Sequence, residues 1–248
     1  MKKIILFLLV AHATSAQFNE TIRSGGAFAV GRGIFQVQSS LNYSQTNMKE
    51  TSGQGWSTNT ALRFGLTPLF EINSVLEYKT ETTHANDITT KTNGLSVAAV
   101  GMRYHLYTSR GWIPNLGVLV RFKIPRSGGD YSTKYLAPRI LFVASQSITK
   151  RLKLSTQFGI YWNGNDKHPI GNYVINLSTP IGKKLSAFVE NVGDIQQGVL
   201  VSSIDTGISW LLRKDLQLDL YGGHGNNDGV KDYFVSTGIH WRTKSLRR

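Results

Sequence analysis

Apolar side chains recur at every second position in successive segments of this chain, with polar or small residues between them. In the segment 152–162, the apolar positions are Leu152, Leu154, Phe158, Ile160 and Trp162. Successive side chains of a β-strand point to opposite faces, so such a segment has one apolar face and one polar face. Beyond residue 32 the chain shows no sustained helical period. The pattern therefore predicts an all-β protein.

Twelve segments carry this alternation, and we expect each of them to form one strand. Their ranges are 33–45, 55–66, 69–80, 94–107, 112–124, 134–147, 152–163, 171–179, 184–192, 200–212, 215–223 and 232–242. The connections fall into two classes that alternate strictly along the chain. Five are tight turns, and six are longer polar segments centred near residues 50, 87, 129, 167, 196 and 227.

An even number of strands, with short turns at one end and longer loops at the other, is typical of a bacterial outer-membrane barrel. Strands of this length match the roughly 9–11 residues that cross a bilayer at a tilt. A soluble β-sandwich also alternates, but it would need buried aromatic residues in the middle of its strands. We predict a transmembrane antiparallel β-barrel of about 12 strands, with short periplasmic turns and longer extracellular loops.

Aromatic residues gather at the strand ends, on the apolar face. With the short turns in the periplasm, the outer ends carry Tyr43, Trp56, Tyr78 and Trp162, and the inner ends carry Trp112, Trp210 and Trp241. Amphipathic rings prefer the two membrane–water interfaces, so these residues are expected to form two aromatic girdles.

The first sixteen residues predict a secretory signal peptide. Lys2 and Lys3 precede an apolar run over residues 4–10, and small residues at 14–16 suit a cleavage site, with cleavage after Ala13 as an alternative. We expect residues 17–32 to form a periplasmic N-terminal segment or to tuck into the lumen. The barrel would then span residues 33–242, followed by a basic tail over 243–248.

The formal net charge of +13 would by itself suggest a nucleic-acid partner. A chain exported from the cytoplasm does not meet the genome, so we exclude that partner. Many of the basic residues lie in or beside the short turns and in the tail, where they can meet the phosphates of outer-membrane lipids. The chain has no cysteine and no convergent set of metal ligands, so we expect no metal and no cofactor.

If the apolar face meets lipid, the polar face lines the barrel lumen. Its predicted selectivity residues are Arg63, Glu71, Arg103, Arg121, Arg139, Glu190, Asp205 and Asp219. The bases lie on early strands and the last three acids on strands roughly opposite, while Glu71 would pair locally. Two interpretations stay open. Opposed walls could select small polar solutes in a narrow pore, or paired charges could only hold the barrel shut.

An outer-membrane lipid hydrolase would need a nucleophile and a base near the outer rim. The loop histidines His84, His168 and His224 are the available bases, and Asp166 beside His168 is the most suggestive pair. No serine stands at a convincing position, and no known catalytic motif is present, so we expect no enzyme and no catalytic residue. A structural or surface-binding barrel remains the alternative to a channel, and the oligomeric state is left open.

Several segments, in this order, resemble an outer-membrane β-barrel family named for the meta-pathway of phenol degradation and often labelled a transporter. They are residues 62–72, 138–139, 147–154, 187–190, 216–220 and 232–239. The resemblance implies a channel in the outer membrane of a Gram-negative bacterium, for small solutes that include hydrophobic or aromatic molecules. One departure is the basic tail after Trp241, because such barrels usually end on an aromatic residue.

Overall fold

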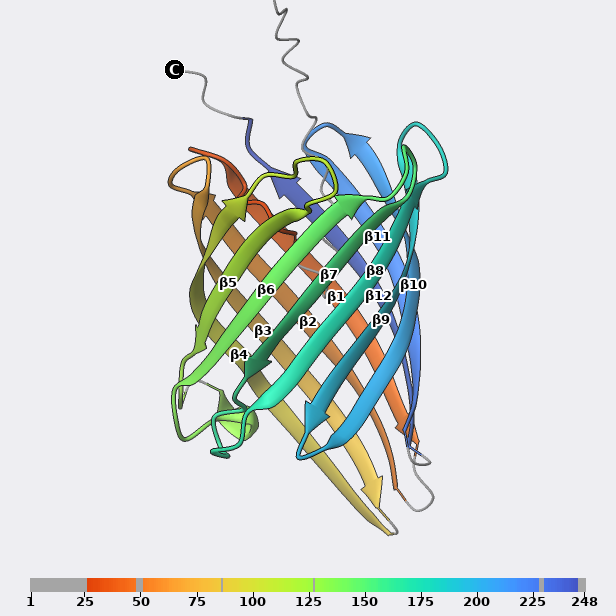
Figure 1. Cartoon of the computed structure of the whole chain (residues 1–248). Helices are drawn as coiled ribbons and strands as arrows, with labels where there is room; N and C mark the ends of the chain where they lie inside the picture. The colour runs from red at the N-terminus through yellow and green to blue at the C-terminus, as the bar shows by residue number, and fades with distance from the viewer. Residues whose placement is uncertain (1–25, 48–50, 86, 127, 228–229, 245–248) are drawn as a thin grey trace, which may run out of the picture.

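The computed structural model describes residues 26–47, 51–85, 87–126, 128–227 and 230–244. Within them the chain forms a closed antiparallel barrel of twelve strands in sequence order (Figure 1). The strands are β1 (Phe35–Asn47), β2 (Thr51–Gly65), β3 (Phe70–Ala85), β4 (Ile88–Tyr107), β5 (Asn115–Lys123), β6 (Ala137–Ser147), β7 (Lys153–Tyr161), β8 (Ile170–Pro180), β9 (Leu185–Gln196), β10 (Val199–Arg213), β11 (Leu216–Asn227) and β12 (Val230–Arg242). A short 3-10 helix, η1 (Gly129–Tyr131), lies between β5 and β6. None of the helical residues described is part of a helix long and apolar enough to cross a membrane.

The barrel closes because the first strand pairs with the last. Val37 on β1 stands opposite Leu62 on β2 and opposite Trp241 on β12. Every described strand therefore has an antiparallel neighbour on each side, and the wall of the barrel has no edge strand. The predicted fold class, an all-β antiparallel barrel of about 12 strands, is confirmed.

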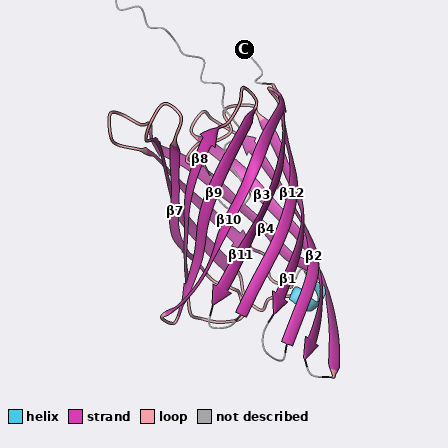
Figure 2. Cartoon of the chain, turned by 90° about the vertical axis from the view of Figure 1, so that its right-hand side faces the viewer, coloured by secondary structure: helices cyan, strands magenta, loops and turns pink. Residues whose placement is uncertain are grey.

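The polarity of the two faces of the sheet is the reverse of that in a water-soluble protein, because the polar side chains lie inside and the apolar side chains lie outside. On β1 the polar side chains of Gln36, Gln38 and Ser40 are buried inside the barrel, whereas apolar Leu41 is exposed. Around the ring, large apolar residues such as Phe142 and Leu220 are likewise exposed on the outer face. Figure 2 shows that the strands are tilted relative to the axis of the barrel. An apolar outer surface around a polar interior is the arrangement that a lipid environment requires.

Several strands continue past their predicted ends on the loop side. β3 has 16 residues and β4 has 20, and their hairpin reaches beyond the rest of the barrel at the lower end of Figure 1. The β9–β10 connection is reduced to Gln197 and Gly198, both with positive φ. Backbone pairing does not need an apolar face, so it continues where the hydrophobic alternation stops. Longer connections remain at 124–136 and 162–169.

The chain ends are only partly covered by the described residues. The predicted signal peptide over 1–16 and the residues up to 25 lie outside them, as does the tail from residue 245. Residues 26–34 precede β1 at the end of the barrel that carries the short turns, at the top of Figure 1. Contacts of residues 26–30 with Glu71, Arg103 and His105 place this segment against the inner wall of the barrel.

Candidate functional site in the barrel lumen

All eight predicted lumen charges lie on the inner face of the barrel. Six of them are buried, namely Arg63, Glu71, Arg103, Glu190, Asp205 and Asp219. Arg121 and Arg139 are partly exposed to the lumen. They reach the interior because each occupies the same alternation as the buried polar residues of its strand.

A cluster of three charges occupies the turn end of the lumen. Arg63 Nε and Nη2 donate to the two carboxylate oxygens of Glu71, at 2.8 and 2.7 Å, in a bidentate pair. Arg103 Nε lies 3.8 Å from the same carboxylate. Glu71 is fully buried, so its local pairing among the bases agrees with the sequence-based expectation. The cluster keeps an excess of one positive charge.

The segment before β1 supplies backbone groups to this cluster. Arg103 Nη1 donates to the carbonyl of Gly26 at 2.8 Å, and Arg63 Nη2 donates to the carbonyl of Phe28 at 3.2 Å. In return, the N–H of Val30 donates to Glu71 Oε2 at 2.9 Å. Of the two placements that the sequence left open for residues 17–32, residues 26–30 therefore occupy the lumen.

The same segment is held against the wall by packing. The ring of Phe28 stacks on that of His105, with centroids 4.7 Å apart, and His105 Nδ1 lies 3.0 Å from the carbonyl oxygen of Ala27. A Cβ on Gly117 would lie 2.5 Å from that same oxygen. The close approach of two backbones therefore requires glycine at position 117. The segment narrows the turn end of the lumen.

Two further bases face each other across adjacent strands. Arg121 on β5 is the direct register partner of Arg139 on β6. Arg121 Nε donates to Asn73 Oδ1 at 2.8 Å, on one side. Arg139 turns the other way, donates to Asn172 Oδ1 at 3.2 Å, and lies 5.2 Å from the ring centroid of Tyr161. The two guanidinium groups thus point away from each other along the inner wall of the barrel.

The acidic wall lies on β9 to β11, half-way around the ring from β3 to β5. Glu190 and Asp205 are direct register partners, and both are buried. Asn176 Nδ2 donates to Glu190 Oε2 at 3.1 Å, and Ser203 Oγ donates to Asp205 Oδ1 at 3.0 Å. Opposed basic and acidic walls are therefore present in the geometry, while their role in selectivity stays a prediction.

A polar network crosses the seam where the barrel closes. Asp219 Oδ2 lies 2.6 Å from His240 Nε2, and Gln217 Nε2 donates to Asp219 Oδ1 at 2.8 Å. His240 Nδ1 lies 3.1 Å from Gln38 Nε2, so the network joins β11, β12 and β1. The sequence predicts Asp219 as a lumen residue but not its pairing with His240, because the pair depends on the register between two strands.

The predicted girdle residues lie on the outer face. Trp56, Tyr78, Trp210 and Trp241 are each exposed by between 38% and 51%, and Trp112 in the β4–β5 turn is exposed by 87%. Tyr43 packs on Trp56 with ring centroids 5.0 Å apart. Trp162 is partly exposed, and its Nε1 donates to the carbonyl of Lys167 at 3.2 Å. These positions suit rings at two membrane interfaces.

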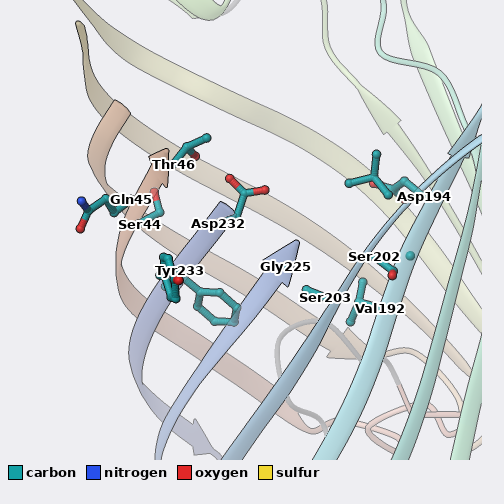
Figure 3. Close-up of a pocket in the computed structure, with 13 residues that line it drawn as sticks. Ser44, Gln45, Thr46, Val192, Asp194, Ser202, Ser203, Gly225, Asp232 and Tyr233 are labelled. Carbon is teal, nitrogen blue, oxygen red and sulfur yellow. The ribbon is translucent and has the colours of Figure 1, made fainter. Parts of the chain in front are cut away.

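A cavity of about 270 Å³ opens at the loop end of the lumen (Figure 3). Its inward-facing lining includes Ser44, Asp194, Ser203, Asp232 and Phe234. These residues are not among the lumen positions predicted from the sequence. They lie near the strand ends, where inward-facing Val192 and Phe234 are as apolar as outward-facing Ile195 and Tyr233, so the alternation gives no contrast.

The loop histidines contact neighbours in their own hairpins or loops. His168 donates its backbone N–H to Asp166 Oδ1, and its Nδ1 lies 2.7 Å from the same oxygen. The backbone hydrogen bond, followed by the ring contact, holds the pKa of the Asp166 carboxyl below its usual range. His224 stacks on Tyr233, and His84 contacts Thr89. No group of three potential metal ligands occurs among the described residues.

Known structures with the same fold are membrane barrels. An outer membrane channel from Pseudomonas putida F1 matches with a TM-score of 0.69 and 11% identity, over 90% of this chain and 100% of that one. The translocator domain of the autotransporter NalP from Neisseria meningitidis matches with a TM-score of 0.58 and 12% identity, over 86% and 89%. The NanC porin matches with a TM-score of 0.55 and 9% identity, over 82% and 98%.

No curated protein matches the chain in sequence. A protein family, in contrast, matches from residue 18 to residue 243, which includes all twelve described strands. The match extends through the order of segments on which the sequence resemblance was based. The chain therefore belongs to the family described as "Putative MetA-pathway of phenol degradation".

Proposed function

We propose that this protein is an outer-membrane channel for small solutes. The observation that carries the proposal is a closed barrel with an apolar outer surface and a polar, oppositely charged interior. An apolar exterior is stable in lipid. Charged side chains in the interior can interact with a polar solute that crosses the membrane inside the barrel. The family, and the likeness in fold to a known outer membrane channel, support the same function.

The walls of the lumen suggest how solutes are selected. Arg121 on β5 stands across from the acidic wall of β9 to β11, and Arg139 on β6 lies beside Arg121, so a field runs across the lumen. A solute with separated charges or a strong dipole gains from orientation in that field. Inward-facing Leu119, Leu141, Val143 and Val174 are apolar, but they are buried by neighbouring side chains. The family description is what adds hydrophobic or aromatic solutes to this proposal.

Conductance of the full-length protein in planar bilayers tests the proposal. We expect discrete steps of small amplitude, because residues 26–30 narrow the turn end. We also expect Arg121→Ala together with Arg139→Ala to change the ratio of cation to anion permeability. Absence of channel events above the level of an empty membrane would refute an open pore. It would favour the second candidate, a closed structural or surface-binding barrel held by buried pairs such as Arg63 with Glu71.

The outer surface supports a location among outer-membrane lipids of a Gram-negative bacterium. Lys184, Arg213 and Lys214 are exposed at the turn end, next to outward-facing Trp210 and Trp241. Basic groups there can bind lipid phosphates while the indoles occupy the interface. Lipid hydrolysis is the third and weakest candidate, since the Asp166–His168 pair hydrogen-bonds within its own loop. Incubation of the folded protein with phospholipid, followed by assay of released fatty acid, tests it.

A further inference from the structure

We propose that the cavity at the loop end of the lumen binds small organic cations, in particular ammonium groups carried on an aromatic or apolar body. The inference deepens the proposed function, because it assigns a class of solute to the outer mouth of the channel. It rests on the cavity, on the charges that line it and on the aromatic residues that lead inward from it.

Carboxylates enter the cavity from two sides. Figure 3 shows Asp232 of β12 on one side and Asp194 of β9 on the other, with Ser44 of β1 near Asp232. No lysine or arginine occurs among the described residues that line the cavity. Arg139 contacts the same Asn172 and Tyr161 that hydrogen-bond to Asp194, so it offsets part of that charge from outside the cavity lining. Asp232 adds a second negative charge, so a positive group in the cavity is attracted and an anion of the same size is repelled.

Asp194 is held in place by its neighbours. Its Oδ1 accepts a hydrogen bond from Asn172 Nδ2 at 2.8 Å, and its Oδ2 accepts one from the Tyr161 hydroxyl at 3.1 Å. Each carboxylate oxygen can accept a further hydrogen bond. Asp232 is partly exposed. One acid is thus held by two hydrogen bonds, and the other is accessible to a ligand.

Aromatic rings continue from the cavity into the lumen. The ring of Phe234 meets that of Tyr221 edge to face, with centroids 5.7 Å apart, and Tyr221 lies 6.1 Å from Phe188. A Cβ on Gly223 would clash both with the Phe234 ring and with a carboxylate oxygen of Asp205, so glycine at this position lets a ring and a buried acid meet. Ring faces and carboxylates together favour organic cations over metal ions, because the rings also accept the apolar body.

The size of the cavity restricts the ligand. Its volume of about 270 Å³ lies just below the range of about 300–1,000 Å³ that is usual for small-molecule sites. A single aromatic ring with a short ammonium side chain fits this volume, whereas an oligosaccharide does not. The chemical class is therefore a small aryl-alkyl ammonium ion.

Binding of three probes to the full-length protein in detergent micelles tests the proposal by calorimetry. The probes are 2-phenylethylammonium, neutral 2-phenylethanol and anionic phenylacetate, which share a ring and differ mainly in charge. We expect the ammonium ion to bind most tightly. We expect Asp194→Asn combined with Asp232→Asn to weaken it by about tenfold, as loss of two nearby charges predicts. Asp166→Asn, which removes a loop-end carboxylate outside the cavity, is the matched control.

Equal binding of all three probes would overturn the proposal, and so would unchanged ammonium binding in the double variant. A drop in the Asp166→Asn control as large as in the double variant would show a general surface-charge effect and would also overturn it. Folding of each variant is checked by its migration before and after boiling in detergent gels. Binding needs no transport, so an absent conductance with retained binding refutes the channel and leaves the site standing.

Phe234→Leu provides a second, charge-neutral test of the same site. The loss of the ring should weaken 2-phenylethylammonium severalfold while both aspartates remain. Unchanged ammonium affinity in this variant would overturn the aromatic part of the proposal.

Discussion

Glu190 and Asp205 are direct cross-strand partners on β9 and β10, and both carboxylates are buried inside the barrel. Like charges directly opposite each other in a sheet oppose its stability. Asn176 and Ser203 donate hydrogen bonds to the pair. The position of the pair on the wall opposite Arg103 and Arg121 gives the lumen its electrostatic asymmetry.

Removal of this charge pair should change ion selectivity. In Glu190→Gln combined with Asp205→Asn, the hydrogen-bonding shape is nearly kept, and we expect the permeability ratio of K⁺ to Cl⁻ to fall by about twofold or more. The reversal potential in a salt gradient across a planar bilayer measures this ratio. Asp215→Asn, in the turn between β10 and β11, is the control. A double variant with the wild-type reversal potential would contradict the transverse-field mechanism.

Loss of the Glu71 carboxylate should destabilise the barrel strongly. Glu71→Gln leaves the guanidinium groups of Arg63 and Arg103 without the carboxylate that lies between them, so we expect a loss of about 3–5 kcal/mol in the free energy of unfolding. Urea titration of the protein in lipid vesicles measures it. Glu81→Gln removes an acid that pairs with Lys79 and accepts a long hydrogen bond from Tyr131, both partly exposed, and should cost about 0–1 kcal/mol.

The double variant Arg63→Gln with Glu71→Gln measures how much of this loss of stability comes from the ion pair itself and how much from the packing of the two side chains. If the two residues act as a pair, the double variant loses less stability than the two single variants added together. Strict additivity would show that the bidentate contact contributes little.

The sequence alone predicts the strands and the face of the sheet on which each side chain lies. It does not predict which side chains contact each other within the lumen. Period-two alternation is local, so it is enough to place Arg63 and Glu71 on the inner face. Their bidentate contact depends on the register of β2 against β3, which inter-strand hydrogen bonds determine. The extensions of the strands on the loop side are not predicted, for a different reason. In the Thr-rich residues 79–85 both faces are polar, so the strand has no hydrophobic signal. Around Asp194 and Asp232 the inward-facing Val192 and Phe234 are apolar like their outward-facing neighbours, so the two faces do not differ.

Displacement of the N-terminal segment should widen the turn end of the lumen. Gly117→Val places a side chain where the carbonyl of Ala27 now lies, and that backbone must move away from the wall. We expect single-channel conductance to increase in planar bilayers. Gly171→Ala is the control, because its Cβ would meet Ile195 at an ordinary distance of 3.6 Å. An unchanged conductance in Gly117→Val, with unfolding in urea like that of the control, would show that this segment does not limit the pore.

The membrane-facing role of the outer surface can be tested at one position in the middle of a strand. Phe142 lies on the outer face of β6, is 59% exposed and is flanked by Val118 and Phe158 on the neighbouring strands. In water, Phe142→Lys would be a mild surface change. At the middle of a bilayer, a lysine on the lipid face costs about 2–4 kcal/mol.

We therefore expect Phe142→Lys to lower the free energy of unfolding in lipid vesicles by that amount, as measured by urea titration. Thr80→Lys is the matched control, because Thr80 is exposed on the outer face two residues beyond Tyr78, and near an interface the cost falls to about 0–1 kcal/mol. A depth-dependent difference between the two variants would place the hydrocarbon layer between the girdles that contain Tyr78 and Trp210. Equal costs would argue that this apolar belt does not contact lipid, because the cost of an outward-facing lysine depends on its depth only in a bilayer.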